Sequence, residues 1–243
     1  MRCWKRWQTT AAGRKRAQEP VAESLELSLD TASQLASIAL SCEGDTLAEL
    51  TWRINRDHSK QLLPAIDSLL ARQSASQRDL TAIFVCTGPG GYAGLRVGVS
   101  TAKGLAFALE QPLAGVGRLE IEAYAHAAYG GPVAAVHAAG RGELAWAAYA
   151  ADPDWRELTP PRLCKPGELV AALPPAALVT GELDDELAAS LVGGGHHLVR
   201  GAAGARRAAL LAELGWARLR AGRADDPKSL VPLYLREPAI GPQ

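Results

Sequence analysis

Hydrophobic and polar residues alternate over a short stretch that begins at Leu25. Leu25, Leu27 and Leu29 are separated by polar side chains, and a period of two is typical of a β-strand that buries one face. Similar apolar runs cover residues 35–40 and 47–54, with short polar turns between the runs. This pattern predicts three consecutive strands that pair as a meander.

A helical period replaces the alternation after residue 57. Apolar residues recur three and four positions apart between residues 62 and 70, and Asp57 or Ser59 can cap the helix that they predict. Pro64 lies in the early turns of this helix, where proline is tolerated. The other elements predicted in the first half are a strand at 82–85, a helix at 95–109, a strand at 112–116 and a helix at 119–129.

The same order of elements begins again at residue 131, in a shorter form and without convincing identity between the halves. The predicted elements are strands at 133–136 and 144–149, a helix at 166–173, a strand at 177–180, a helix at 184–192, a strand at 197–200 and a last helix at 202–221. A meander followed by alternating helices and strands is expected of an actin-like unit, in which helices cover a mixed sheet. We therefore expect an α/β fold with two actin-like lobes, at 23–130 and 131–243.

Composition adds few constraints. The chain has 243 residues of which 48% are hydrophobic, enough for one large or two small cores. Its formal net charge is zero, so no overall field attracts nucleic acid or a membrane surface. Residues 1–22 are basic and lack periodicity, and we interpret them as a disordered tail or an over-long start. No apolar run reaches the length of about 18 residues that a membrane span needs, so we expect a soluble, cytoplasmic protein.

A glycine-rich turn joins the fourth predicted strand to the second predicted helix. It begins TGPGGYAGLR at residue 87, and its glycines permit a tight turn that presents backbone N–H groups at the start of a helix. A Walker A loop requires Lys and then Ser or Thr where Leu95 and Arg96 stand, and the dinucleotide-binding spacing is not met either. Two interpretations stay open: an anion cradle that includes Gly88 and Gly90, or a turn that lets the helix pack closely on its strand.

The helix after this turn has one face of small side chains. Gly94, Gly98, Ala102 and Leu105 recur at spacings of three and four, so another element can approach closely. Glycine inside a helix is less favourable than alanine by about 0.5–1 kcal/mol, and we expect close packing to offset this cost. The packing partner can belong to this chain or to another one.

An aspartate ends the first predicted strand. Asp30, which Thr31 follows, can take part in phosphate or metal chemistry at this place, or it can simply cap a turn. If the chain binds a nucleotide, the candidate residues are Asp30, Thr31, Gly88 and Gly90. The four cysteines lie too far apart in the sequence to form paired metal-ligand spacings, so we predict no metal site.

Five segments resemble the TsaB (YeaZ) family and occur in the family's order. They are LSLDTAS (27–33), DHSKQLLPAIDSLL (57–70), TGPGGYAGLRVGVSTAKGLA (87–106), AAGRGELAWAAY (138–149) and VPLYLREP (231–238). This family is the non-catalytic, actin-like member of the bacterial machinery that makes threonylcarbamoyladenosine on tRNA. The resemblance implies a two-lobed, duplicated, ribonuclease-H-like fold of the actin and heat-shock ATPase type.

The resemblance also implies a heterodimer with the paralogue TsaD, which transfers threonylcarbamoyl to adenosine 37 of tRNAs that read codons beginning with A. The ATPase TsaE and the tRNA would be reached through that complex, and a homodimer is expected when TsaD is absent. In the family, the first two helices of each partner form the contact. Carried over to this sequence, the partner interface comprises His58, Leu62, Leu63, Ile66, Leu70, Arg96, Gly98, Ala102 and Leu105, with Leu62, Ile66, Gly98 and Ala102 at its centre.

The same resemblance implies no chemistry in this chain. A TsaD-like enzyme binds a metal through two histidines separated by three residues, and YAHAAYGG (124–131) offers only His126. The Asp common before the AlaGlyArgGly motif is replaced by His137 or Ala138, and residues 91–93 replace Ser, Phe and Thr. We expect no catalytic residue, no metal and no required cofactor, while ATP or ADP binding stays open. The alternative function is an actin-like phosphotransferase or ATPase that uses Asp30 and the glycine turn.

Overall fold

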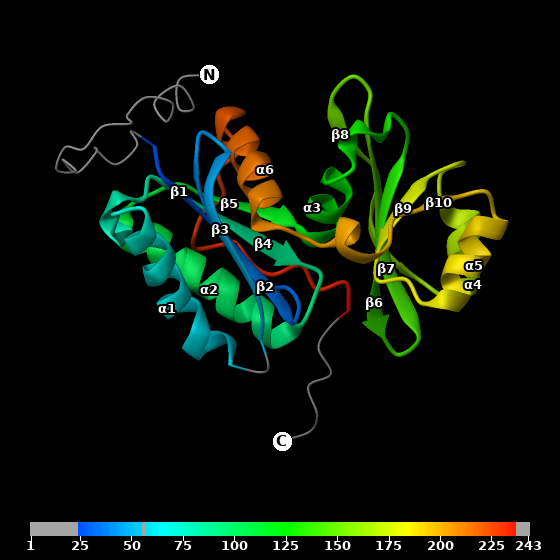
Figure 1. Ribbon diagram of the computed structural model, residues 1–243, viewed down its shortest axis with the longest axis horizontal. Helices are drawn as coiled ribbons and strands as arrows, with labels where there is room; N and C mark the ends of the chain where they lie inside the picture. Colours follow the sequence, from blue (N-terminus) through cyan, green and yellow to red (C-terminus); the bar gives the residue numbers. More distant parts are fainter. Residues whose placement is uncertain (1–23, 55–56, 237–243) are drawn as a thin grey trace, which may run out of the picture.

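The computed structural model describes residues 24–54 and 57–236, and it shows two lobes that each contain a five-stranded sheet (Figure 1). The predicted basic tail at residues 1–22 lies outside the described residues. Within the described part of the chain, no helix is both long and apolar enough to cross a membrane.

The first sheet has the strand order β3-β2-β1-β4-β5. Its strands are β1 (Glu26–Asp30), β2 (Leu35–Cys42), β3 (Asp45–Arg53), β4 (Ala82–Gly88) and β5 (Leu113–Gly117). The first three are antiparallel neighbours, as the alternating pattern predicts, whereas β4 and β5 run parallel to β1. Because parallel strands end at the same edge of a sheet, Asp30 and the glycine turn after β4 lie at one edge.

The second sheet has the order β10-β9-β6-β7-β8. Its strands are β6 (Val133–Gly140), β7 (Glu143–Ala151), β8 (Trp155–Cys164), β9 (Leu178–Gly181) and β10 (His197–Leu198). An antiparallel meander is again followed by two parallel strands, so β6 to β10 occupy in turn the places of β1 to β5. The repeat predicted from element order is confirmed, and the fold is a duplicated actin-like α/β fold.

The sequence pattern does not predict β8. This strand contains Pro160 and Pro161, and proline is confined to edge strands and bulges because it cannot donate a hydrogen bond to a neighbouring strand. β8 is indeed an edge strand, and its pairing with β7 shifts register twice. The sequence of β8 favours a strand only weakly, and its pairing with β7 is what makes this segment a strand.

Helices cover both faces of the first sheet. α1 (His58–Arg72) and α2 (Tyr92–Leu109) pack on one face, and α6 (Ala208–Arg220) packs on the other. On β4, Ile83 and Val85 lie in the core cluster of α1 and α2, whereas Phe84 lies in the core cluster of α6. α4 (Pro166–Ala172) and α5 (Asp185–Gly193) cover the second sheet, and the short α3 (Arg118–Tyr124) contacts strands of both sheets (Figure 1).

The last helix differs from its prediction in extent and in place. Residues 201–204 form a separate 3₁₀ turn, α6 begins only at Ala208, and it packs on strands of the first sheet instead of the second. An apolar period identifies which face of a helix is buried, but it does not identify the sheet that buries it. The helix predicted at 119–129 is also too long, because α3 ends at Tyr124.

The segment after α6 stays with the first lobe. The Asp225 amide donates a hydrogen bond to the Leu113 carbonyl at 2.7 Å, and the Leu233 amide donates one to the Thr87 carbonyl at 2.8 Å. The predicted boundary at residue 131 therefore separates the two sheets, but residues 131–243 do not all belong to the second lobe.

The packing of α6 on β4 gives a testable prediction about stability. A Cβ added at Gly215 would lie 2.3 Å from Cγ of the fully buried Phe84, whereas a Cβ at Gly104 in α2 meets nothing within 4 Å. Gly215→Ala should lower the free energy of unfolding by about 1–3 kcal/mol through overpacking. The control Gly104→Ala should raise it by up to about 1 kcal/mol through helix propensity. Urea denaturation followed by circular dichroism measures both, and a stabilising Gly215→Ala would contradict this position of α6.

Candidate functional site: the junction between the two lobes

Five charged side chains form a continuous chain of ion pairs between the lobes. They are Asp30 at the end of β1, Arg206 in the segment before α6, Glu122 and Arg118 in α3, and Glu182 directly after β9. We call this set the junction chain. Its first four members are buried and Glu182 is half-exposed. The junction chain therefore runs from the first sheet to the second through mostly buried charges.

Arg206 occupies the centre of the junction chain. Its Nε and Nη2 donate to the two carboxylate oxygens of Asp30, the Nη2–Oδ1 distance being 3.2 Å. Nη1 donates to Glu122 Oε1 at 3.0 Å, and Nη2 also donates to Ser33 Oγ at 3.0 Å. Burial disfavours the charged guanidinium, but Asp30 and Glu122 raise the pKa of Arg206 above its ordinary value. The side chain is therefore a permanent cation held between two carboxylates.

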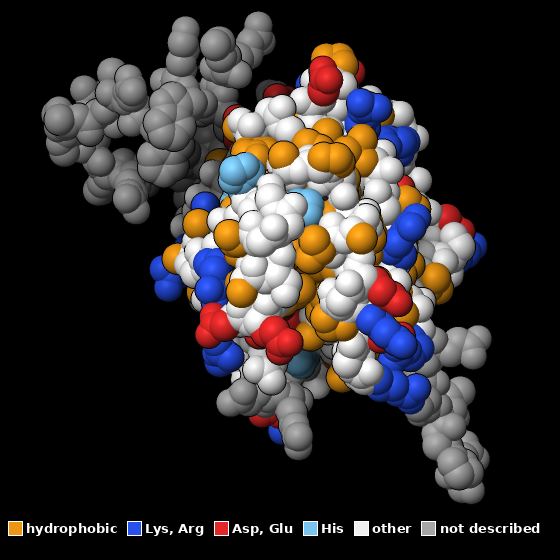
Figure 2. Space-filling view, turned by 90° about the vertical axis from the view of Figure 1, so that its right-hand side faces the viewer, with side chains coloured by type: hydrophobic (Ala, Val, Ile, Leu, Met, Phe, Trp, Pro, Cys, Tyr) orange, Lys and Arg blue, Asp and Glu red, His pale blue; other side chains and the backbone are white. Residues whose placement is uncertain are grey.

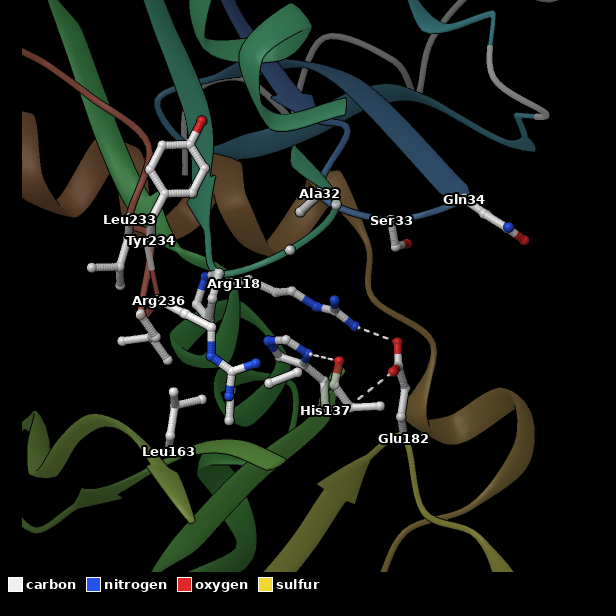
Figure 3. Close-up of a pocket in the computed structure, with 17 residues that line it drawn as sticks. Ala32, Ser33, Gln34, Arg118, His137, Leu163, Glu182, Leu233, Tyr234 and Arg236 are labelled. Atoms are coloured by element: carbon white, nitrogen blue, oxygen red, sulfur yellow. Dashed lines mark hydrogen bonds and ion pairs between the residues drawn. The ribbon is translucent and has the colours of Figure 1, made fainter. Parts of the chain in front are cut away.

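Arg118 continues the junction chain into the second lobe. Its Nε donates to Glu122 Oε1 at 2.9 Å and its Nη2 to Glu182 Oε1 at 2.7 Å, and the second contact is drawn in Figure 3. The other oxygen of Glu182 accepts from the Ala138 amide at 3.2 Å. Burial by itself raises the pKa of Glu182, but Arg118 and this amide outweigh it and hold the pKa below its usual value.

A cavity of about 410 Å³ opens beside the junction chain, between the glycine turn and the β6–β7 hairpin (Figure 3). Its walls come from both lobes and from the C-terminal segment, where Arg236 pairs with Glu143 of β7. His137 lines this cavity, and its Nδ1 donates to the Ala138 carbonyl at 2.9 Å. Burial lowers the pKa of His137, and the positive charge of Arg118 lowers it further. The neutral imidazole thus keeps Nε2 as a buried acceptor, and the described residues provide no partner for it.

Comparison with known proteins decides the family. The sequence model of the family described as TsaD, tRNA N6-adenosine threonylcarbamoyltransferase, matches residues 52–239. The chain belongs to this family. Within this family, similarity to proteins named TsaB assigns the chain to the TsaB (YeaZ) group, as the sequence motifs indicate.

The relatives support this assignment over different lengths. The tRNA threonylcarbamoyladenosine biosynthesis protein TsaB of Bacillus subtilis is 36% identical over 118 residues, which cover 49% of this chain and 52% of the relative. The protein of the same name in Escherichia coli is 33% identical over 128 residues, 52% of this chain and 55% of that one. The chain thus spans about half the length of the curated relatives that it matches. A crystal structure described as an uncharacterized protein with similarity to peptidase YEAZ from Pseudomonas aeruginosa superposes with a TM-score of 0.73, at 26% identity, over 88% of this chain and 100% of that one.

The candidate nucleotide-binding residues of this TsaB-group chain contact other residues of the same chain. The Asp30 carboxylate binds Arg206, and its Oδ1 also accepts from the Ala32 amide at 3.0 Å, so Asp30 caps its turn. Thr31 is buried and its hydroxyl donates to the Gly94 carbonyl at 2.7 Å. A Cβ at Gly90 would lie 2.2 Å from the Ala32 carbonyl oxygen. Close packing thus accounts for Gly90, and binding of a nucleotide stays an untested prediction.

The predicted partner interface requires a correction. Six of its nine residues are buried inside this protein: Leu62, Ile66, Leu70, Gly98, Ala102 and Leu105. The small face of α2 receives Thr31 of this chain, because a Cβ at Gly98 would lie 2.2 Å from Thr31 Oγ1. Of the other three, Leu63 and Arg96 are exposed and His58 is partly buried. The apolar period correctly identified the buried face of α1 and α2. The residues carried over from the family resemblance lie mostly on that buried face, which this chain itself covers.

A second face of α2 points to solvent. Ala93, Ser100 and Gly104 are exposed along it, and Phe107 beside them has 70% of its surface exposed. On α1, Leu63 is 46% exposed. We call Leu63, Arg96, Ser100, Gly104 and Phe107 the outer face of α1 and α2. The outer face thus contains exposed apolar side chains and an exposed glycine. The spacing of apolar and small residues in the sequence does not distinguish such exposed positions from core positions.

The junction residues Arg206, Glu122, Arg118 and Glu182 were not among the sequence-predicted site residues. Arg118 and Glu122 are four positions apart on a helix, a spacing that brings side chains together. This was the one local signal that the sequence offered. Arg206 and Glu182 are distant in sequence from both partners, so only the fold brings them to α3.

The environment of His137 gives a prediction about pH. Its pKa is lower in the folded protein than in the unfolded chain, so the unfolded state binds more protons below about pH 6.5 and folding stability falls on acidification. His137→Asn keeps a donor for the Ala138 carbonyl without a titrating ring. It should lose less stability than the wild type between pH 7.5 and pH 5.5, as measured by urea denaturation.

His126, whose pKa burial also lowers, should maintain part of the slope in this variant. His197→Asn serves as the control because His197 is exposed, and it should follow the wild type. Equal losses in His137→Asn and in the wild type would show that His137 is not held neutral.

Proposed function

We propose that this protein acts in threonylcarbamoyladenosine biosynthesis as a non-catalytic subunit that binds and activates the transferase TsaD. The observation that carries the proposal is the similarity to proteins named TsaB for that biosynthesis, together with the match to the TsaD family. The fold is that of a paralogue, and paralogues with related surfaces can associate about a pseudo-twofold axis. The transfer to adenosine 37 then belongs to TsaD, and this chain supplies no catalytic residue.

The geometry at Asp30 supports a non-catalytic role. A phosphotransferase of this fold needs free carboxylates to hold Mg²⁺ against phosphate groups. Both oxygens of Asp30 are engaged by Arg206, so the carboxylate is not free. This pairing disfavours the alternative of an actin-like phosphotransferase or ATPase.

We place the contact with TsaD on the outer face of α1 and α2. Gly104 is exposed inside an 18-residue helix, and no atom of this chain lies within 4 Å of its Cβ position. An interior glycine disfavours the helix by about 0.8–1 kcal/mol relative to alanine, and packing within this chain gives no compensation for it. An approaching helix of TsaD can use this space, with Leu63 and Phe107 as the exposed apolar groups of the outer face. The arrangement matches recognition of an apolar helix face.

The proposed mechanism is a shift of population in the partner. If TsaD binds through its own helix pair, this chain stabilises the TsaD conformation that matches the outer face, to the extent that it binds that conformation more tightly. An interface of about 1,200–2,000 Å² in total is sufficient for a stable complex. In the absence of TsaD, a second copy of this chain can cover the same face.

TsaE and tRNA are reached through the complex in this proposal. The formal net charge of the chain is zero, and the face of the second lobe shown in Figure 2 carries both Lys or Arg and Asp or Glu side chains. A phosphate backbone is recognised by clustered positive charge, so this composition favours no extensive tRNA surface on this subunit.

Gly104→Arg tests the proposed contact. The position is open, so the variant should fold with an unchanged circular dichroism spectrum, while the added side chain should weaken binding of TsaD at least about tenfold, or 1.4 kcal/mol. Co-purification and calorimetry with the TsaD of the same organism measure this. The matched control is Gly104→Ala, which adds one methyl group and should bind. Unchanged affinity of Gly104→Arg would place the contact elsewhere. Gly98→Arg is unsuitable because Thr31 fills that space.

A further inference from the structure

The actin-like fold implies a metal nucleotide between the lobes, and the residues at the junction do not fit one. Mg²⁺ is bound through one or two carboxylates together with phosphate oxygens. The junction chain contains three carboxylates, Asp30 at the end of β1, Glu122 in α3 and Glu182 after β9. Both oxygens of Asp30 and both oxygens of Glu182 already accept hydrogen bonds from groups of this chain. Glu122 Oε1 accepts from both arginines, which leaves Oε2 of Glu122 as the one oxygen of these three carboxylates without a partner among the described residues. Across residues 24–54 and 57–236, no three His, Cys, Asp or Glu side chains are grouped so that they could hold a metal ion.

The groups that cover these carboxylates are themselves cations. Arg206 contacts Asp30 and Arg118 contacts Glu182, and Glu122 accepts from both arginines through Oε1. The side chains of Arg206 and Arg118 are only 6% and 5% exposed. Buried charges are tolerated only when they are paired and hydrogen-bonded, so each guanidinium depends on carboxylates from more than one segment of the chain.

The segments joined in this way control the relation of the two lobes. Asp30 ends β1, the central strand of the first sheet, and Glu182 follows β9, which lies beside the central strand β6 of the second sheet. α3 carries Glu122 and Arg118 and contacts strands of both sheets and also α6. Arg206 lies two residues before α6. A rotation of one lobe against the other would separate at least one of these pairs.

We propose that Arg206 is a built-in cation that, through Glu122 and Arg118, holds the two lobes together in place of a metal nucleotide. The lobes of this protein are then fixed in one arrangement without any ligand. The proposal does not depend on TsaD binding. In this proposal, Arg206 is the residue that distinguishes this chain from actin-like proteins whose two lobes bind a nucleotide between them.

Removal of the Arg206 guanidinium should create a site at which a metal ion can bind. In Arg206→Ala, the carboxylates of Asp30 and Glu122 would face the vacated space, with Arg118 as the remaining cation beside Glu122. Two buried carboxylates with one fewer counter-charge repel each other, and a divalent cation is the simplest group that compensates them. The variant should therefore gain a response to Mg²⁺ or Mn²⁺ that the natural protein lacks.

The experiment compares Arg206→Ala with Arg207→Ala. Arg207 is the next residue and also makes an ion pair, with Glu49 at 2.6 Å, but its side chain is 60% exposed, and exposed pairs contribute little. In EDTA, Arg206→Ala should show a Tm lower by roughly 10 °C and a larger radius of gyration by small-angle X-ray scattering. Arg207→Ala should match the natural protein in both.

Metal and nucleotide additions complete the test. With 10 mM MgCl₂ or MnCl₂, Arg206→Ala should recover part of its Tm and compactness, and Arg206→Ala/Asp30→Asn should not respond. The natural protein should show no change in Tm with Mg-ADP. A rise that disappears in Asp30→Asn would overturn the proposal, because a nucleotide would then displace Arg206.

Arg206→Lys provides a second test in case Arg206→Ala does not fold. It keeps one positive charge, but an ammonium lacks the planar fork that contacts both oxygens of Asp30 while it reaches Glu122. An intermediate Tm and radius of gyration in EDTA support the proposal. A radius of gyration that is unchanged in every folded Arg206 variant would overturn it, because the lobes would then be held by other contacts.

Discussion

The rest of the structure depends on the pairing of buried charges at the junction between the lobes. A buried ion pair contributes little net stability, because desolvation offsets the attraction, but loss of one partner costs about 3–5 kcal/mol. The junction chain is therefore weak as a source of stability and strong as a constraint on geometry. Asp30, Glu122 and Arg206 must meet for any of them to be buried. This requirement fixes the end of β1, α3 and the segment before α6 relative to one another.

The two duplicated sheets are covered by different sets of helices. The two sheets share one topology. The second sheet is covered by α4 and α5 on one face and by α3 on the other, whereas α6 and the segment after it return from the second lobe to cover the first sheet. Because Arg206 lies just before α6, the covering of the first sheet and the placement of the central cation depend on the same return of the chain. The junction between the lobes is therefore built from segments that lie far apart in the sequence.

α2 serves two purposes through two faces. Its inner face uses Gly94 to receive the carbonyl oxygen of Thr31 and Gly98 to receive the Thr31 hydroxyl, which brings the helix against the edge where the strands end. Its outer face leaves Gly104 open and Phe107 exposed. Small residues on a helix permit close approach on either side, so they reveal that something packs there but not what does. The inner face belongs to the fold, and the outer face is the surface on which we propose that a partner binds.

The sequence by itself determined the local elements and their order. Alternation in β1 and helical periods in α1 and α2 depend on neighbours within one element, so the meander, most of the helices and the repeat of the sheet were predictable. Five sequence motifs also indicated the family. Only the tertiary structure decided that β8 pairs at an edge, that α6 covers the first sheet, that Leu62 and Ile66 face inward, and that Arg206 binds Asp30. These outcomes depend on contacts between residues up to 176 positions apart, and no periodic pattern within a single element records which distant segment will supply the partner for a buried charge.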